Sequence, residues 1–113
     1  MGLDQYAGSR ESLDNNFTWR KHAKLQKYME DLWYEQNDGE FNCQYLVLSK
    51  VDIVNLKSCI EKNNMPESEG GFFYGHEFQD ESEKEYKDQD LEFCDWALKE
   101  IEKGREVVYH CWY

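Results

Sequence analysis

Hydrophobic positions in the first third of the chain alternate weakly and then recur with a helical period. The N-terminal segment GLDQYA predicts a short strand, and the turn-like segment GSRESLDNN predicts a loop after it. Apolar residues then follow the spacing i, i+3, i+4, i+7 and i+8, at Leu25, Tyr28, Met29, Leu32 and Trp33. We expect this first helix to begin near Asn15 or Asn16, either of which can cap it, and to end at NDGE.

The remaining pattern predicts two further strands and two further helices. The segment FNCQYLVLS predicts a strand with a buried run from Tyr45 to Leu48, and Ser49 with Asp52 forms a capping pair for a second helix. The apolar positions of the second and third helices are Ile53, Leu56 and Ile60, and Leu91, Cys94, Leu98 and Ile101. Gly104 ends the third helix, and the β-branched and aromatic segment REVVYHCWY predicts an interior strand.

This order of elements predicts an α+β fold, with a small antiparallel or mixed sheet of about three strands packed against three helices. Residues 1–113 fit a single domain, with no internal repeat or linker. A hydrophobic content of 40%, with 16% aromatic residues, is too high for a disordered chain. We therefore expect a folded protein with an aromatic-rich core.

Charge is distributed unevenly along this acidic chain. The formal net charge is −11, yet residues 17–27 contain four cationic side chains and no carboxylate. On the predicted helix, Arg20, Lys24 and Lys27 fall on the solvated side, and His22 lies at the edge of the apolar face. Residues 77–92 hold eight carboxylates, which we interpret as a solvated acidic face. Direct nucleic-acid binding is disfavoured because so acidic a chain repels phosphate groups.

No motif for catalysis or for a cofactor is recognisable. The glycines of EGGFFYG have neither the spacing nor the following Lys and Ser or Thr of a phosphate-binding loop. The cysteines, Cys43, Cys59, Cys94 and Cys111, are spread singly, so we expect buried thiols and no metal site. His110 is a poor base for Cys111 because adjacent strand residues point to opposite faces. We expect no cofactor, and enzyme activity stands third among the hypotheses because no nucleophile or activated base can be named.

The sequence also indicates a cellular location. No run approaches the roughly 18 apolar residues of a membrane span, and the N-terminus lacks the basic start and apolar stretch of a signal peptide. We expect a cytoplasmic protein that has no membrane partner.

Several segments occur in an order that is similar to one family. They are MGLDQY, WRKHAKLQKY, CQYLVLSKVDIVNLKSC, GGFFYG and the aromatic C-terminus. This set resembles a family of small bacteriophage and bacterial proteins that open with MGLDMYL and carry WRKHN-like and GFFFG-like segments. Some members are labelled phosphoglycerate kinase, but this chain is too short for two kinase lobes and lacks a phosphate loop. The resemblance therefore implies a phage setting, in the cytoplasm of the bacterial host.

The resemblance carries over to particular positions. The matching residues are Gly2, Leu3, Asp4, Tyr6, Trp19, Arg20, Lys21, His22, Gly71, Phe72, Phe73, Gly75 and Trp112. The chain departs from the family pattern at Ala23 and Gln26, where Asn and His are usual, and at His110 and Cys111, where two serines are usual. If the family binds a polar ligand through those groups, this chain has altered the site.

Our first hypothesis is a non-enzymatic phage accessory protein that binds and modulates a bacterial host protein. Its contact surface is the acidic third helix or the aromatic loop with Phe72, Phe73 and Tyr74. The alternative is a protein that binds or sequesters a nucleotide or other small anionic metabolite in a pocket formed by residues 19–22 and closed by that loop. A further alternative is an acidic mimic of DNA.

These hypotheses define the candidate site. Its residues are Asp4, Tyr6, Trp19, Arg20, Lys21, His22, Phe72, Phe73, Tyr74 and Trp112. Within this set, we expect Asp4 to pair with Arg20 or Lys21. The sequence leaves the formation of homo-oligomers open.

Overall fold

The computed structural model describes residues 3–9, 17–37, 39, 41, 44–66 and 79–112. In chain order the elements are β1 (Asp4–Ser9), β2 (Phe17–Arg20), α1 (Ala23–Gln36), β3 (Tyr45–Leu48), α2 (Lys50–Glu61), α3 (Gln79–Glu102) and β4 (Val107–Trp112). The predicted α+β class is confirmed, with four strands in the described ranges instead of about three.

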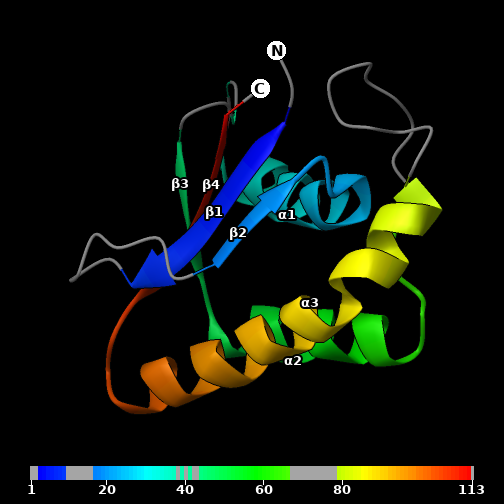
Figure 1. The fold of residues 1–113 in the computed structure, drawn as a ribbon. Helices are drawn as coiled ribbons and strands as arrows, with labels where there is room; N and C mark the ends of the chain where they lie inside the picture. The colour runs from blue at the N-terminus through cyan, green and yellow to red at the C-terminus, as the bar shows by residue number, and fades with distance from the viewer. Residues whose placement is uncertain are drawn as a thin grey trace.

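The sheet is antiparallel throughout, with the strand order β2-β1-β4-β3. β4 is an interior strand as predicted, because β1 pairs with it from Asp4↔Trp112 to Ser9↔Val107 and β3 covers its other edge. The helices gather on one side of the sheet, and α3 crosses close to β2 (Figure 1). The two edge strands are therefore β2, beside α3, and β3.

The prediction that the first helix begins near Asn15 or Asn16 is wrong. Residues Phe17–Arg20 form β2, and α1 begins only at Ala23. This segment is aromatic and β-branched, and it alternates between Trp19, buried, and its exposed neighbours Thr18 and Arg20. Pairing with β1 therefore overrides the helical period, which holds only from Leu25 onwards.

The core lies between the inner face of the sheet and the helices. The sheet contributes Ala7, Trp19, Leu46, Leu48, Val107, Tyr109 and Cys111, and the helices contribute Leu25, Met29, Ile53, Leu56, Ile60, Phe93, Cys94 and Ala97. The predicted buried run in β3 is half right. Leu46 and Leu48 are buried, but Tyr45 and Val47 are 58% and 41% exposed because no described helix covers the outer face of this strand.

The capping pair predicted for the second helix is confirmed. The backbone N–H of Asp52 donates to Ser49 Oγ at 3.2 Å, and the backbone N–H of Ser49 donates to Asp52 Oδ2 at 3.0 Å. This capping box satisfies two backbone donors at the start of α2. The apolar face predicted for α2 is likewise buried.

The acidic run differs from the predicted solvated face. Nearly all of it belongs to α3, which continues without a break to Glu102. One side of this helix packs inward, so Ser82, Asp90 and Phe93 are buried, while the predicted Leu98 and Ile101 are only half-buried. The run therefore spans both sides of an amphipathic helix, with most of its described acids exposed and Asp90 buried. Within the described ranges, no helix is long and apolar enough to cross a membrane.

Candidate functional site

The predicted basic segment folds into β2 and the turn that leads to α1. Strand alternation points Trp19 into the core and leaves Arg20 exposed. Lys21 has a left-handed backbone, with φ of 56°, and redirects the chain so that His22 becomes the N-cap residue of α1 and is fully buried. The segment is therefore divided between the interior and the surface.

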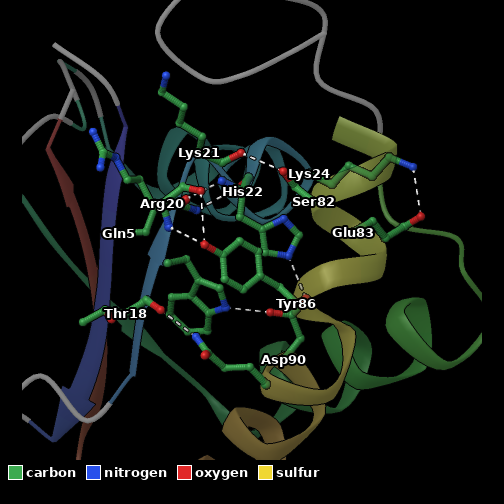
Figure 2. Close-up of polar contacts among 12 residues, drawn as sticks. Gln5, Thr18, Arg20, Lys21, His22, Lys24, Ser82, Glu83, Tyr86 and Asp90 are labelled. Carbon is green, nitrogen blue, oxygen red and sulfur yellow. Dashed lines mark hydrogen bonds and ion pairs between the residues drawn. The ribbon is translucent and has the colours of Figure 1, made fainter. Parts of the chain in front are cut away.

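The buried half of the segment is held by Asp90, a carboxylate that sequence reasoning missed. Asp90 lies on α3 and is 1% exposed. Its Oδ1 accepts a hydrogen bond from Trp19 Nε1 at 2.8 Å, and its Oδ2 lies 2.7 Å from His22 Nε2 (Figure 2). The His22 ring also stacks on Tyr86, one helical turn before Asp90, with centroids 5.2 Å apart.

This carboxylate and imidazole form a buried ionisable pair. Burial raises the pKa of Asp90, and the hydrogen bonds from His22 and Trp19 act against that rise by stabilising the ionised form. His22 Nδ1 has no hydrogen-bond partner among the described residues. Among the described residues, the imidazole ring is therefore held by one hydrogen bond, between His22 Nε2 and Asp90 Oδ2.

The backbone of His22 joins a second buried network, which crosses the sheet. Gln5 Oε1 accepts from the His22 N–H at 2.8 Å, and Gln5 Nε2 donates to His22 O and to the Tyr109 hydroxyl. That hydroxyl donates to Gln26 Oε1 at 2.6 Å. These bonds connect β1, β4 and the start of α1. Both the backbone and the ring of His22 therefore have hydrogen-bond partners inside the protein.

Side chains of α3 also satisfy the outer edge of β2. The Tyr86 hydroxyl accepts from the Arg20 backbone N–H at 3.2 Å, and Gln89 Nε2 donates to Thr18 O at 2.6 Å (Figure 2). Ser82 Oγ donates to Lys21 O at 3.3 Å. One helix thus supplies partners to outward backbone groups of β2 and of the turn that follows it.

The exposed half of the segment makes weaker contacts. Arg20 Nε lies 4.0 Å from Asp4 Oδ1, the pairing expected from the sequence, and these side chains are 77% and 49% exposed. Such an exposed pair contributes little to stability. Lys24, predicted to lie on the solvated side, is instead 7% exposed, with ion pairs to Asp80 and Glu83 on α3. The basic residues do not converge on one pocket.

A shallow, open pocket of about 310 Å³ lies at this edge of the sheet. It is lined by Asp4, Tyr6, Thr18, Trp19, Arg20 and Tyr86. Three further predicted site residues, Phe72, Phe73 and Tyr74, lie outside the described residues. His22 is absent from the pocket lining, and its Nε2 is already hydrogen-bonded to Asp90.

The outer face of the sheet carries an aromatic row. The ring of Tyr6 stacks on the ring of His110 with centroids 4.9 Å apart. The ring of Tyr45, on the strand at the other edge of β4, has its centroid 4.7 Å from that of His110. Burial lowers the pKa of His110. Trp112, a predicted site residue on the same strand, is 60% exposed and pairs in register with Asp4, but it is not among the residues that line the pocket.

The exposed side of α3 carries a line of carboxylates. Glu81, Glu85, Asp88 and Glu92 are all exposed, at the positions i, i+4, i+7 and i+11 of one helix face. We call these four residues the acidic stripe. Other acids of α3 have cationic partners, since Asp80 and Glu83 pair with Lys24, and Asp95 pairs with Lys57. No ion pair to the stripe forms within the described part of the chain.

Little in the described residues suggests reactive chemistry. No three His, Cys, Asp or Glu side chains among them converge as metal ligands. Burial raises the pKa of Cys94 to about 12, which keeps this thiol protonated and a poor nucleophile near neutral pH. Asp90 was missed because it lies in a run of acids, and only its spacing from Tyr86, Phe93 and Ala97 on one helix face marks it.

Comparison with known proteins adds no further constraint. No protein-family model matches the chain, and neither a curated protein nor a solved structure matches it.

Proposed function

We propose that this protein is a phage-encoded, non-enzymatic accessory protein that binds and modulates a protein of the bacterial host. The observation that carries the proposal is the acidic stripe on α3. It presents four exposed carboxylates along one helix face, with no cationic partner in the described residues. A partner with a basic surface fits this face by charge complementarity.

The way α3 is held supports this role for its outer side. The inner side is anchored by the buried Asp90, by Tyr86 on the edge of β2 and by the apolar Phe93 and Ala97. These contacts fix the orientation of the helix, so the carboxylates are presented on a rigid element. Rigid presentation lowers the entropy lost on binding.

The proposal is tested by affinity capture from a host lysate with the full chain immobilised. The stripe variant is Glu85→Gln, Asp88→Asn, Glu92→Gln. The matched control is Glu35→Gln, Glu61→Gln, Glu102→Gln, which removes the same three charges from other exposed helix positions. A captured host protein is then purified, and its affinity is measured at several salt concentrations.

We expect the stripe variant to bind the purified host protein about tenfold more weakly or worse, with a smaller dependence on salt, while the control binds like the wild type. Equal loss in both variants would mean that net charge alone attracts the partner. Equal retention in both, or no host protein retained by the wild type, would contradict the proposal.

The same experiment separates the alternatives. Displacement of the captured protein by duplex DNA would identify the stripe as a mimic of nucleic acid. Binding of a small anionic ligand is the second candidate function. It is supported by the pocket that Arg20 lines, because the Arg20 guanidinium is exposed and only weakly paired with Asp4. A compound extracted from the wild type, and absent from Arg20→Ala, would favour that second function.

A further inference from the structure

The two edges of the sheet differ in how their backbone groups are satisfied. At β2, α3 supplies Tyr86 to Arg20 and Gln89 to Thr18. β3, the other edge strand, receives no such bond from the described residues. An uncovered edge strand is a template for pairing with another strand, and proteins usually protect it with charged side chains, Pro or a bulge. The sequence of β3, Tyr45-Leu46-Val47-Leu48, contains neither a charged side chain nor a proline.

In an antiparallel sheet, the backbone groups of successive residues point alternately toward one neighbouring strand and the other. This alternation can be followed from β2 to β3. Lys21 N donates to Leu3 O at 2.8 Å, so this pair and, by alternation, Gln5 and Trp19 carry the bonds between β1 and β2. Tyr6, between the bonded positions of β1, therefore turns its backbone groups toward β4.

The same alternation continues across β4. Tyr6 lies opposite His110, so the backbone of His110 bonds to β1. The adjacent residue, Tyr109, therefore turns its backbone toward β3, where its partner is Leu46. Leu46 and Leu48 thus carry the bonds to β4. Tyr45 and Val47 are left with their N–H and C=O groups directed away from the sheet.

The apolar surface is concentrated at the same place. The exposed large hydrophobic side chains among the described residues are Tyr34, Tyr45, Val47, Val51, Val54 and Trp112. Four of these belong to β3 or to the first turns of α2, and a single residue, Ser49, separates these two elements. Tyr45 and Val47, which carry the outward backbone groups, thus also expose apolar side chains that gain from burial.

Charge permits a second copy of this chain at the edge despite the net charge of −11. Residues 44–51 contain no acidic side chain. The acidic stripe lies on α3, which packs mainly against α2 and meets the sheet at β2, on the far edge, and at β4. Three strand spacings of roughly 4.8 Å separate the two edges, a distance of about 14 Å that exceeds the Debye length of about 8 Å in physiological salt.

We propose that β3 pairs antiparallel with β3 of a second copy across a two-fold axis. Tyr45 of each copy then exchanges backbone hydrogen bonds with Val47 of the other. The two sheets of four strands join into one continuous sheet, and the exposed side chains of Tyr45 and Val47 add buried apolar area at the new strand pair. Because the dimer uses the edge opposite α3, the inference is independent of the proposed binding of a host protein.

The first test is the association state of the full chain, measured by sedimentation equilibrium from low micromolar to millimolar concentration in physiological salt. Val47→Pro removes the N–H that faces outward and leaves the ladder to β4 intact, because proline is tolerated where the N–H points away from a sheet. Val47→Thr is the matched control, since it keeps the N–H and the β-branched shape.

The expected result is a dimer for the wild type and for Val47→Thr, with dissociation constants within about threefold of each other, since a β-branched polar residue still suits a half-exposed strand position. Val47→Pro raises the constant by about 100-fold or more, because each dimer loses two hydrogen bonds and gains a clash. A wild type that stays monomeric, or a Val47→Pro variant that dimerises like the wild type, overturns the proposal.

A second test needs no substitution and covers the case in which Val47→Pro does not fold. The exchange rate of the Val47 amide hydrogen is followed by NMR as the wild-type protein is diluted. The Val47 amide slows at high concentration, while the Leu46 amide, bonded to β4, is protected at every concentration. An exchange rate at Val47 that does not change with concentration overturns the proposal.

Discussion

At the scale of single residues, Asp90 determines how the segment from Trp19 to His22 is used. Its carboxylate is hydrogen-bonded to the indole N–H of Trp19 and to an imidazole nitrogen of His22, two residues that lie far from Asp90 in the chain. The indole and imidazole would otherwise be buried polar groups without partners, which is costly. Two of the candidate site residues, Trp19 and His22, are therefore explained by folding, and only Arg20 and Lys21 remain exposed in this segment.

Removing the carboxylate should destabilise the protein strongly. Asp90→Ala leaves Trp19 Nε1 and His22 Nε2 buried without their acceptor, so we expect a loss of about 3–5 kcal/mol in the free energy of unfolding. Asp90→Asn retains one acceptor oxygen and should cost less. The measurement is urea denaturation followed by tryptophan fluorescence.

The control for this prediction is Asp88→Ala, an exposed acid on the same helix, which should change stability by less than about 0.5 kcal/mol. If Asp90→Ala unfolds at the same urea concentration as Asp88→Ala, the buried network does not stabilise the fold.

At the scale of elements, local signals and tertiary contacts compete. α2 follows its local signal, since the Ser49 and Asp52 capping box starts it where the sequence predicts. The first helix does not, because residues 17–20 find a strand partner in β1 before the helix can extend backwards. α3 combines both effects, with a helical pattern from the sequence and a buried polar face that depends on β2 and α1.

The contribution of the cap can be measured directly. Ser49→Ala removes the acceptor for the Asp52 N–H, and we expect the free energy of unfolding to fall by about 1 kcal/mol. Ser58→Ala, inside the same helix, is the control. It should be neutral or slightly stabilising, because alanine has the higher helix propensity. A cost at Ser58 equal to that at Ser49 would show that the effect does not arise from capping.

At the scale of the whole molecule, the net charge of −11 and the positions of the acids matter more than any single pair. Some acids of α3 are neutralised internally through Lys24 and Lys57, but the acidic stripe is not paired within the described ranges. The molecule therefore has one acidic helix face next to β2 and one apolar strand edge at β3. These are different surfaces, suited to different partners.

Such an excess of negative charge predicts a salt dependence of stability. Raising NaCl from about 0.02 M to about 0.5 M should raise the thermal unfolding midpoint, because screening weakens repulsion among the acids more than it weakens the few exposed ion pairs. KCl at equal ionic strength should act equally, since screening depends on ionic strength. A midpoint that falls with added salt would mean that the ion pairs outweigh the repulsion.

The sequence by itself determined the α+β class, α2 with its cap, and β4 as an interior strand. These features depend on hydrophobic period, β-branched content and residues within one turn of each other, which are all local in the chain. Only the tertiary structure shows that residues 17–20 form a strand, that Lys24 and Asp90 are buried, and that Tyr45 and Val47 lie on the last strand of the described sheet. The strand at residues 17–20 depends on pairing with β1, and the burial of Lys24 and Asp90 depends on partners 59 to 71 residues away in the chain. The exposure of Tyr45 and Val47 depends on which strand comes last in the sheet, and no local pattern encodes any of these contacts.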